Sequence, residues 1–454
     1  MFRKLLLSLF ALVALGVAAQ SPKYIFYYIG DGMGMGPIVA AQNYNRLILK
    51  NDKPLTMMQM PVVGWALTYS ASSDITDSAA AGTALATGSK TKNYMLGMNA
   101  DTVAVTSIAK ILHDRGYGVA IATSVAPDDA TPGAFFAHVP NRSMTYQIGC
   151  DMAASGYEFV AGAGLRGTET DGKPNDLLDR FAAEGVQIVR GPEGAASITA
   201  ARALLLNNEG SSRSNIGYTI DSIQGTLTLP LIASTALKQL ERTSPDKFFM
   251  MIEGGNIDHA LHGNDAGASI KEIINFDEAL KVAYDFYLAH PDETLIVVTA
   301  DHDTGGMAIV RSGDIGNIDY QKVSKEEFSN FCKAMLKTRN IFTWDDMKAY
   351  MSENLGFFTH IPVSEADETK LKKLFDDTFE LRNTADQKTL YANFNAFAVE
   401  VFNMFNNAVG VTFCTTSHAG NAVPVFAVGV GADLFKGFNN NIDLPAAILK
   451  AVGK

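Results

Sequence analysis

Residues 248–262 contain the clearest set of chemically active side chains in the sequence. The apolar run Phe-Phe-Met-Met-Ile over 248–252 leads into Glu253, and Asp258 and His262 then follow four residues apart. Two residues at this spacing lie on one face of a helix, so their side chains can reach the same ligand. A carboxylate and an imidazole together suit a divalent cation such as zinc. The sequence therefore predicts a metal site after this apolar run.

A second apolar run repeats the arrangement. Residues 294–300 (Thr-Leu-Ile-Val-Val-Thr-Ala) end directly on Asp301 and His302, and Asp31 follows the strand-like run 24–29. In open α/β sheets, active sites form outside the carboxyl ends of the strands. Any one of these side chains could be an ordinary core or surface residue. Together they indicate a cation, because buried charges without a partner are too costly to keep.

The few histidines of the chain fit this interpretation. Half of the eight lie beside the apolar runs or next to a glycine turn, namely His259, His262, His302 and His418. Taken alone, each is better explained as an ordinary core or surface histidine. As a group with the carboxylates, they are candidate ligands of a metal centre.

Ser78 is the candidate nucleophile. It stands in the small-residue segment 76–88, which is typical of a closely packed helix. At the start of that helix, backbone N–H groups and the helix dipole would favour an oxyanion. On this segment alone, an N-cap role for Asp77 or Ser78 explains the sequence equally well.

The glycines at 30, 32, 34 and 36 do not form a dinucleotide-binding loop. The G-x-G-x-x-G pattern needs its third glycine at position 35 or 37, where the chain has Met35 and Pro37. We interpret the glycines as positions where the backbone approaches the metal site closely.

The elements that must hold these residues alternate between strands and helices. Near-continuous apolar strands separated by helices predict an α/β fold with a large, mostly parallel central sheet and helices on both faces, a three-layer sandwich. The expected strands are 24–29, 118–123, 248–252, 295–299 and 423–430, and the expected helices are 37–49, 78–87, 106–114, 269–288 and 445–452.

We expect one catalytic domain over residues 20–454, with insertions near 161–217 and 320–407. The first of these regions is rich in Gly, Glu and small residues. The second is charged, aromatic and helical, and we expect it to lie over one end of the sheet.

The first residues predict a secretory signal peptide over 1–19. Phe2-Arg3-Lys4 is a basic start, residues 5–17 are apolar, and Val17-Ala18-Ala19 is a small-residue cleavage site. The alternative is a buried N-terminal helix. We expect the protein to be periplasmic or secreted, and no later apolar stretch is long enough to span a membrane.

Composition limits the class of partner. The 454 residues are 47% hydrophobic and 19% charged, with a net charge of -11. This acidic balance argues against nucleic acid and anionic membranes as partners, although cations can reverse the local sign for an anionic substrate. The odd cysteine count excludes a complete disulfide framework and leaves open one bridge among Cys150, Cys332 and Cys414.

Taken in order, seven motifs make the chain resemble an alkaline phosphatase. No motif is very specific alone, but their order is that of the family. The motifs are 29–33 (Ile-Gly-Asp-Gly-Met), 76–79 (Thr-Asp-Ser-Ala), 129–132 (Asp-Ala-Thr-Pro), 138–142 (His-Val-Pro-Asn-Arg), 253–262, 299–302 (Thr-Ala-Asp-His) and 418–420 (His-Ala-Gly).

The resemblance implies three cation sites. Asp31 would bridge the second and third of them, and the third would be all-oxygen, as magnesium prefers. The first zinc ion would be held by Asp258, His262 and His418, the second by Asp31, Asp301, His302 and the Ser78 oxygen, and a magnesium ion by Asp31, Thr131 and Glu253.

The resemblance also assigns the residues around the substrate. Arg142 would grip two phosphoryl oxygens and Asp77 would brace it. Asp129 would order water around the third cation, and His259 would approach the phosphate through water. Thr304 departs from the family, many of whose members have histidine there, so we expect a bond to Asp258 to be lost.

The implied function is hydrolysis of small phosphate monoesters through a covalent phosphoserine at Ser78, with release of inorganic phosphate. Homodimers are common in the family, so a homodimer is an expectation here. The alternatives are a related phosphodiesterase or sulfatase, and a non-catalytic protein that sequesters zinc or phosphate outside the cytoplasm. A binding protein would gain nothing from a serine directed at the metals, and a diester offers Arg142 one free oxygen fewer.

Overall fold

The computed structural model describes residues 21–309, 313–338, 342–382 and 386–453. The predicted signal peptide, 1–19, lies outside these residues. Within them, no helix has both the length and the apolar character needed to cross a membrane. The three cysteines all lie in the described part and none is in a disulfide.

One large sheet forms the centre of the molecule, and ten strands of the described residues belong to it. β17 runs antiparallel to both of its neighbours, and every other neighbouring pair is parallel. The expectation of a mostly parallel sheet is therefore confirmed. From one edge to the other the strands are β18 (Gly437–Asn440), β2 (Val62–Leu67), β17 (Val423–Gly429), β10 (Thr294–Ala300), β1 (Tyr24–Gly30), β9 (Phe248–Glu253), β3 (Gly118–Thr123), β4 (Phe159–Gly162), β8 (Ala203–Leu206) and β7 (Gln187–Arg190).

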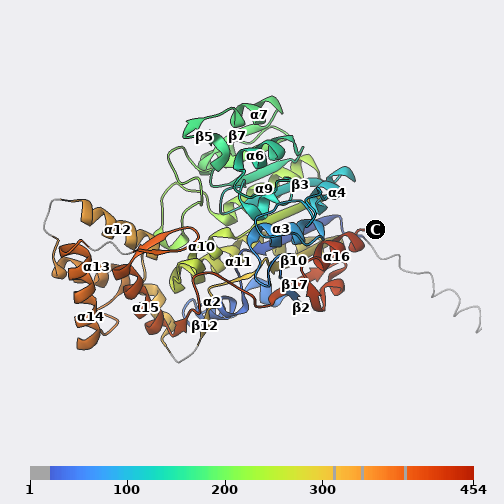
Figure 1. The fold of residues 1–454 in the computed structure, drawn as a ribbon. Coiled ribbons are helices and arrows are strands. Elements are labelled where there is room, and N and C mark those ends of the chain that lie inside the picture. Colours follow the sequence, from blue (N-terminus) through green and yellow to red (C-terminus); the bar gives the residue numbers. More distant parts are fainter. Residues whose placement is uncertain (1–20, 310–312, 339–341, 383–385, 454) are drawn as a thin grey trace, which may run out of the picture.

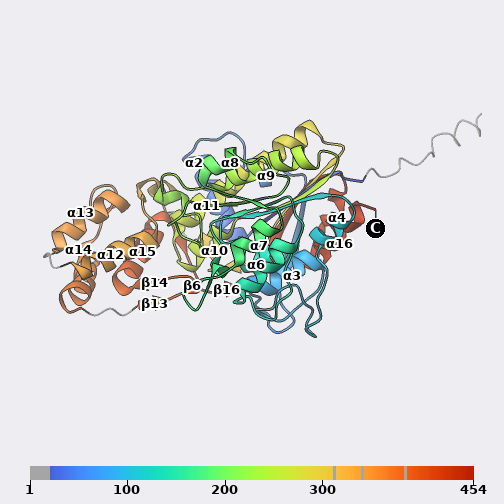
Figure 2. The ribbon, with the colours of Figure 1, turned by 90° about the horizontal axis from the view of Figure 1, so that it is seen from above.

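Helices cover both faces of this sheet, as expected for three layers (Figure 2). On one face lie α2 (Met35–Leu47), α9 (Leu229–Thr243) and α11 (Ala266–Ala289), and on the other lie α3 (Ser78–Thr87), α4 (Ile108–Asp114) and α16 (Asp443–Ala451). The central strands are continuously apolar because neither face meets water.

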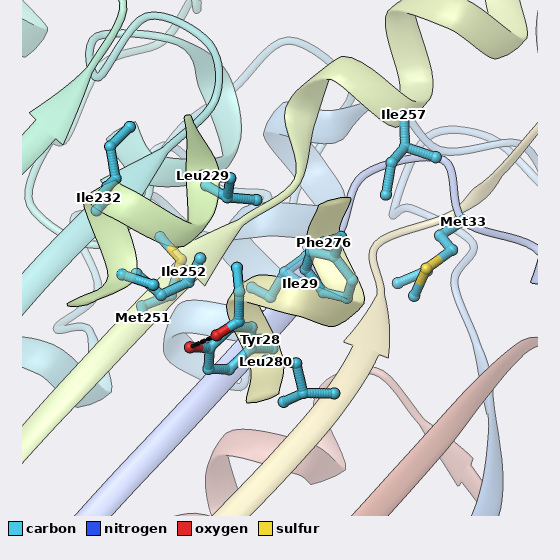
Figure 3. Packing of buried hydrophobic residues seen from close by; sticks show 14 of the residues in the cluster. Tyr28, Ile29, Met33, Leu229, Ile232, Met251, Ile252, Ile257, Phe276 and Leu280 are labelled. Carbon is cyan, nitrogen blue, oxygen red and sulfur yellow. Dashed lines mark hydrogen bonds between the residues drawn. The ribbon is translucent and has the colours of Figure 1, made fainter. Parts of the chain in front are cut away.

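The packing between β1, β9 and α11 explains why the ends of these strands have fixed positions. Tyr28 and Ile252 are fully buried, and the Tyr28 ring lies 5.8 Å from the Phe276 ring of α11, centroid to centroid, with Leu280 beside it (Figure 3). The Tyr28 hydroxyl donates a hydrogen bond to the Ala279 carbonyl, 2.9 Å away, so its polar end is satisfied. Such close packing resists small displacements, which gives the strand ends fixed positions.

Residues 161–217, the first expected insertion, contribute to the edge of the sheet. They supply β7 and β8, which extend its edge beyond β4. The apolar run of β8 is only four residues long, Ala-Leu-Leu-Leu. An apolar run this short fits a buried strand or a buried helix segment equally well, so its pattern alone does not identify a strand.

Residues 320–407 form a separate group of helices at one end of the molecule (Figure 1). We call α12 (Lys325–Lys337), α13 (Trp344–Leu355), α14 (Glu365–Phe375) and α15 (Ala396–Val409) the helical lobe. A hairpin of β13 (Asp386–Lys388) and β14 (Asn393–Asn395) lies between this lobe and α10 (Gly255–His262) in both views (Figures 1 and 2).

Candidate active site

The candidate site lies where three neighbouring strands end. Asp31 directly follows β1, Glu253 is the last residue of β9, and Asp301 and His302 directly follow β10. These parallel strands end at the same edge of the sheet, so their last side chains converge.

Two further ligand candidates come from α10, which begins just after β9. Asp258 and His262 lie one turn apart on this helix, and both are buried. His262 Nε2 is 3.3 Å from Asp258 Oδ2, so the two side chains point at the same place. The prediction that Asp258 and His262 lie on one face of a helix is confirmed.

His418 reaches the site through a short strand pairing. β16 (His418–Ala419) pairs antiparallel with β11 (Asp303–Thr304), which follows Asp301 and His302, and Thr304 stands opposite His418. His418 Nε2 lies 3.9 Å from Asp258 Oδ1. The pairing explains how a residue so late in the chain joins ligands from the centre of the sheet.

His302 belongs to a second group of ligand candidates. Its Nε2 is 3.4 Å from Asp31 Oδ1 and 3.2 Å from Asp301 Oδ2. Atoms of Asp31, Asp301 and His302 lie close enough together to hold one ion, as do atoms of Asp258, His302 and His418. The two groups share His302 and therefore adjoin.

Backbone carbonyls set the tautomers of two of these histidines. His262 Nδ1 is 2.6 Å from the Thr416 carbonyl, and His418 Nδ1 is 2.8 Å from the Thr76 carbonyl. A carbonyl only accepts, so the hydrogen sits on Nδ1 and the lone pair on Nε2. This is the arrangement that metal-binding histidines normally have.

The Thr304 hydroxyl sets the tautomer of His302, as backbone carbonyls set those of His262 and His418. The hydroxyl donates to Asp258 Oδ1, and its oxygen lies 3.1 Å from His302 Nδ1. Since the hydroxyl has one hydrogen, it accepts from Nδ1–H, which leaves the His302 Nε2 lone pair free. Our expectation that Thr304 loses the bond to Asp258 is therefore wrong, because the shorter side chain still reaches that carboxylate.

The residues at the site fit bound cations. Buried polar atoms are normally hydrogen-bonded. Five atoms at this site are buried without a hydrogen-bond partner among the described residues: Asp31 Oδ1, Asp258 Oδ2, Asp301 Oδ2, His262 Nε2 and His418 Nε2. Carboxylate oxygens and imidazole nitrogens are the donors that zinc takes, so cations would satisfy all of them.

The electrostatics lead to the same conclusion. Burial, followed by repulsion from Asp301 and Asp258, raises the pKa of Asp31 well above its ordinary value. Burial likewise raises the pKa of Asp301 to about 7 and that of Glu253 to about 8. Carboxylates this close together stay ionised only when positive charge lies between them.

An all-oxygen group adjoins the two histidine-containing groups. Thr131 Oγ1 is 3.5 Å from Asp31 Oδ2, and Glu253 accepts a hydrogen bond from the Thr123 hydroxyl. Oxygen-only donors suit magnesium. Thr123 was not anticipated from the sequence, although its position as the last residue of β3 is the signal that could have identified it.

Ser78 is the first residue of α3, and Asp77 is its N-cap. Asp77 Oδ1 accepts from the Ala80 N–H at 3.0 Å, so the cap leaves the serine hydroxyl free. Ser78 Oγ lies 3.2 Å from His302 Nε2. The serine is therefore both at a helix N-terminus and beside the second group of ligand candidates.

Arg142 lies across the site between two carboxylates. Its Nη1 is 3.4 Å from Asp77 Oδ2, and its Nη2 is 2.8 Å from Asp129 Oδ1. Arg166, which the sequence did not single out, also reaches Asp129 Oδ1 at 2.8 Å. Burial opposes ionisation of Asp129, but Arg166 and Arg142 hold its pKa well below the ordinary value.

His259 is covered by an aromatic ring that the sequence did not indicate. The ring of Tyr391, from the β13–β14 hairpin, lies 3.7 Å from the His259 ring, centroid to centroid, at 30°. It also lies 5.3 Å from the His262 ring. Burial lowers the pKa of His259 to about 4, so this imidazole is neutral. No local pattern marks Tyr391, because its partners are distant in the chain.

Comparison with known proteins decides the family. The model of the alkaline phosphatase family matches residues 22–162 and 156–453, which is most of the chain. The chain belongs to the alkaline phosphatase family. It is a phosphomonoesterase, which sets aside the non-catalytic alternative.

Individual relatives and solved structures agree with this membership. Alkaline phosphatase 4 of Bacillus subtilis is 28% identical over 436 residues, covering 94% of this chain and 88% of the relative. A cold-active alkaline phosphatase from Shewanella sp. is 26% identical, with a TM-score of 0.79 over 95% of this chain and all of that one. The Thermus thermophilus alkaline phosphatase shares the fold, with a TM-score of 0.77 over 96% of this chain and 92% of that one, at 23% identity.

Proposed function

We propose that Ser78 is the nucleophile of a two-step phosphoryl transfer from phosphate monoesters to water. The observation that carries this proposal is the position of Ser78 Oγ, 3.2 Å from His302 Nε2 at the start of α3. A serine with only a structural role would not need its hydroxyl beside metal-type ligands.

The donor atoms fit two zinc ions and one magnesium ion. When bound, these cations lower the pKa of coordinated hydroxyls and water and neutralise charge on the attacking and leaving oxygens. One zinc site would consist of Asp258, His262 and His418, the other of Asp31, Asp301, His302 and Ser78, and the magnesium site of Asp31, Thr131 and Glu253.

In the first step, Ser78 Oγ gives up its proton and forms a bond to phosphorus as the bond to the leaving oxygen breaks, and the leaving oxygen takes up a proton and departs as the alcohol. In the second step, water attacks the phosphoserine, and inorganic phosphate leaves as the serine hydroxyl is restored. Each displacement is in line and inverts phosphorus, so the two together give overall retention.

Arg142 would hold the phosphoryl group during both steps. Its planar guanidinium can bind two non-bridging oxygens at once. Asp77 and Asp129 hold this group from two directions, which limits its movement. A monoester dianion offers one more free oxygen than a diester, so this arrangement favours monoesters over diesters.

The test is Ser78→Ala, compared with Ser89→Ala just beyond the other end of α3. We expect Ser78→Ala to lower kcat by several orders of magnitude while zinc content stays near that of the parent, since three other side chains remain at that site. Ser89→Ala should leave kcat and zinc content unchanged. Near-normal turnover by the Ser78 variant would refute the phosphoserine route.

We also propose that the protein is exported and cleaved after Ala19. This rests on the basic start, the apolar residues 5–17 and the small residues before Gln20. N-terminal sequencing of the protein recovered outside the cytoplasm should begin at Gln20. A mature protein that still carries residues 1–19 would contradict this.

A further inference from the structure

The cavity at the site is much larger than a phosphoryl group requires. Its volume is about 940 Å³, at the upper end of the range for small-molecule sites. Beyond Arg142, its wall includes the side chains of Ile75, Tyr94 and Leu390, which are 46%, 57% and 54% exposed. Single exposed apolar side chains are ordinary, but several that line one cavity indicate a binding surface.

Tyr94 holds a backbone conformation that costs energy for a bulky residue. Its φ is +72°, in the left-handed region. Its carbonyl accepts a hydrogen bond from the Arg142 N–H at 2.7 Å, so the strained residue is tied directly to the arginine. Strain of this kind is concentrated at ligand-binding sites, where the surrounding structure maintains it.

Leu390 and Tyr391 also line this cavity, and they form the tip of the β13–β14 hairpin. Lys388 pairs with Asn393, and the Thr389 N–H donates to the Ala392 carbonyl at 2.8 Å, which leaves only these two residues in the turn. Two-residue hairpin tips normally have Gly, Asn or Asp. Leu390 and Tyr391 depart from this preference, and such departures are often found at functional sites.

The hairpin is fixed to the helix that bears the metal ligands. Phe394, at its base, is buried, and the Lys325 ammonium lies 4.6 Å from the centre of its ring. Lys325 Nζ also donates to the Gly263 carbonyl, directly after α10, at 2.8 Å. The hairpin tip therefore has a defined position relative to His259 and His262.

We propose that Ile75, Tyr94, Leu390 and Tyr391 form a subsite for a flat aromatic leaving group, such as an aryl group or a nucleoside. The inference rests on the proposed function, since it concerns the group attached to the phosphoryl that Arg142 holds. Aromatic rings and apolar side chains that line one cavity offer stacking and apolar contact to such a group. An alkyl or polyol leaving group would gain much less.

The test compares the binding of two stable phosphonates, phenylphosphonate and methylphosphonate, by calorimetry. The protein is the zinc- and magnesium-loaded Ser78→Ala variant, so no turnover is involved. We expect phenylphosphonate to bind about tenfold more tightly. Adding Tyr94→Ala or Leu390→Ala should reduce that preference, while the Kd of methylphosphonate stays within about twofold.

Tyr69→Ala is the matched control, because Tyr69 is also an exposed tyrosine but does not line the cavity. It should leave the preference unchanged. Equal binding of the two phosphonates, or equal weakening of both by the added substitutions, would overturn the subsite and leave the phosphoryl site intact. Failure of both phosphonates to bind would overturn the phosphoryl site and the subsite together.

Discussion

Thr304 illustrates how much of the site depends on single atoms. One hydroxyl accepts from the His302 Nδ1–H and donates its own hydrogen to Asp258. It therefore orients one candidate ligand from each histidine-containing group. Partners of this kind fix ligand orientation and tune affinity for the metal.

Replacing Thr304 with valine should weaken zinc binding. The volume is nearly kept, but both hydrogen bonds are lost, and removal of such partners costs about 10- to 100-fold in metal affinity. Zinc release to a competing chelator measures this. Thr235→Val is the control, since its hydroxyl donates to the Leu231 carbonyl on α9, away from the site. Equal zinc affinity in both variants would show that Thr304 is not a partner of the ligands.

At Gly32, the absence of a Cβ atom leaves room for the Asp258 side chain. The φ of Gly32 is +70°, and a Cβ there would lie 2.6 Å from Asp258 Oδ1. Gly32→Ala should therefore displace Asp258 and lower zinc content. Gly172, with φ +72° and nothing within 4 Å of an added Cβ, is a matched control for backbone strain alone. Equal zinc content in Gly32→Ala and Gly172→Ala would contradict the steric argument.

At the scale of elements, the sequence predicts best where a strand is long and apolar. Residues 248–253 and 294–300 could be identified because both faces of their strands are covered, and the ligands follow directly. The antiparallel direction of β17 could not be predicted, because a buried strand has the same apolar pattern in either direction. The β13–β14 hairpin was missed because its strands are short and largely polar, and its apolar tip lacks the residues that usually mark a tight turn.

The junction between α11 and the residues around Thr219 should make stability depend on pH. Burial raises the pKa of Glu272 on α11 from 4.5 to about 7, although the Thr219 N–H donates to its Oε1 at 2.6 Å. The folded state thus holds this proton more tightly than the unfolded state. The stabilising contribution is complete below pH 4.5 and is lost as the pH rises through 7.

Glu272→Gln keeps the acceptor for Thr219 and removes the titration. Relative to this variant, the parent should lose about 3 kcal/mol of stability between pH 4.5 and pH 7. Urea unfolding of both proteins at several pH values measures the difference. Glu241→Gln, at an exposed position on α9, is the control for the substitution itself. A stability difference between Glu272→Gln and the parent that does not change with pH would contradict the burial argument.

At the scale of the whole molecule, the site is assembled from segments between residues 31 and 418. The ligand candidates could be predicted because the order of the motifs is specific to a family. Arg166 and Tyr391 could not, because they meet Asp129 and His259 only through tertiary packing. The homodimer also stays a prediction, because the structure of a single chain does not test it.

Cations should contribute to the stability of the whole fold, because their candidate ligands come from several elements: the ends of β1, β9 and β10, and α10 and β16. Chelation should lower Tm, since ligands that bind only the folded state stabilise it by mass action. Zinc alone should then restore part of Tm and activity, and zinc with magnesium the rest. Parallel thermal scans and assays measure this. Full recovery with zinc alone would argue against a separate all-oxygen site.

The most direct test of the central claim is to look for phosphate on Ser78 itself. The metal-loaded enzyme is mixed with a phosphate monoester, quenched in acid during turnover, digested, and examined by mass spectrometry. We predict one phosphoryl group on Ser78 in the parent and none in the Ser78→Ala variant. Full turnover with an unmodified Ser78, or with phosphate attached to another side chain, would contradict the account.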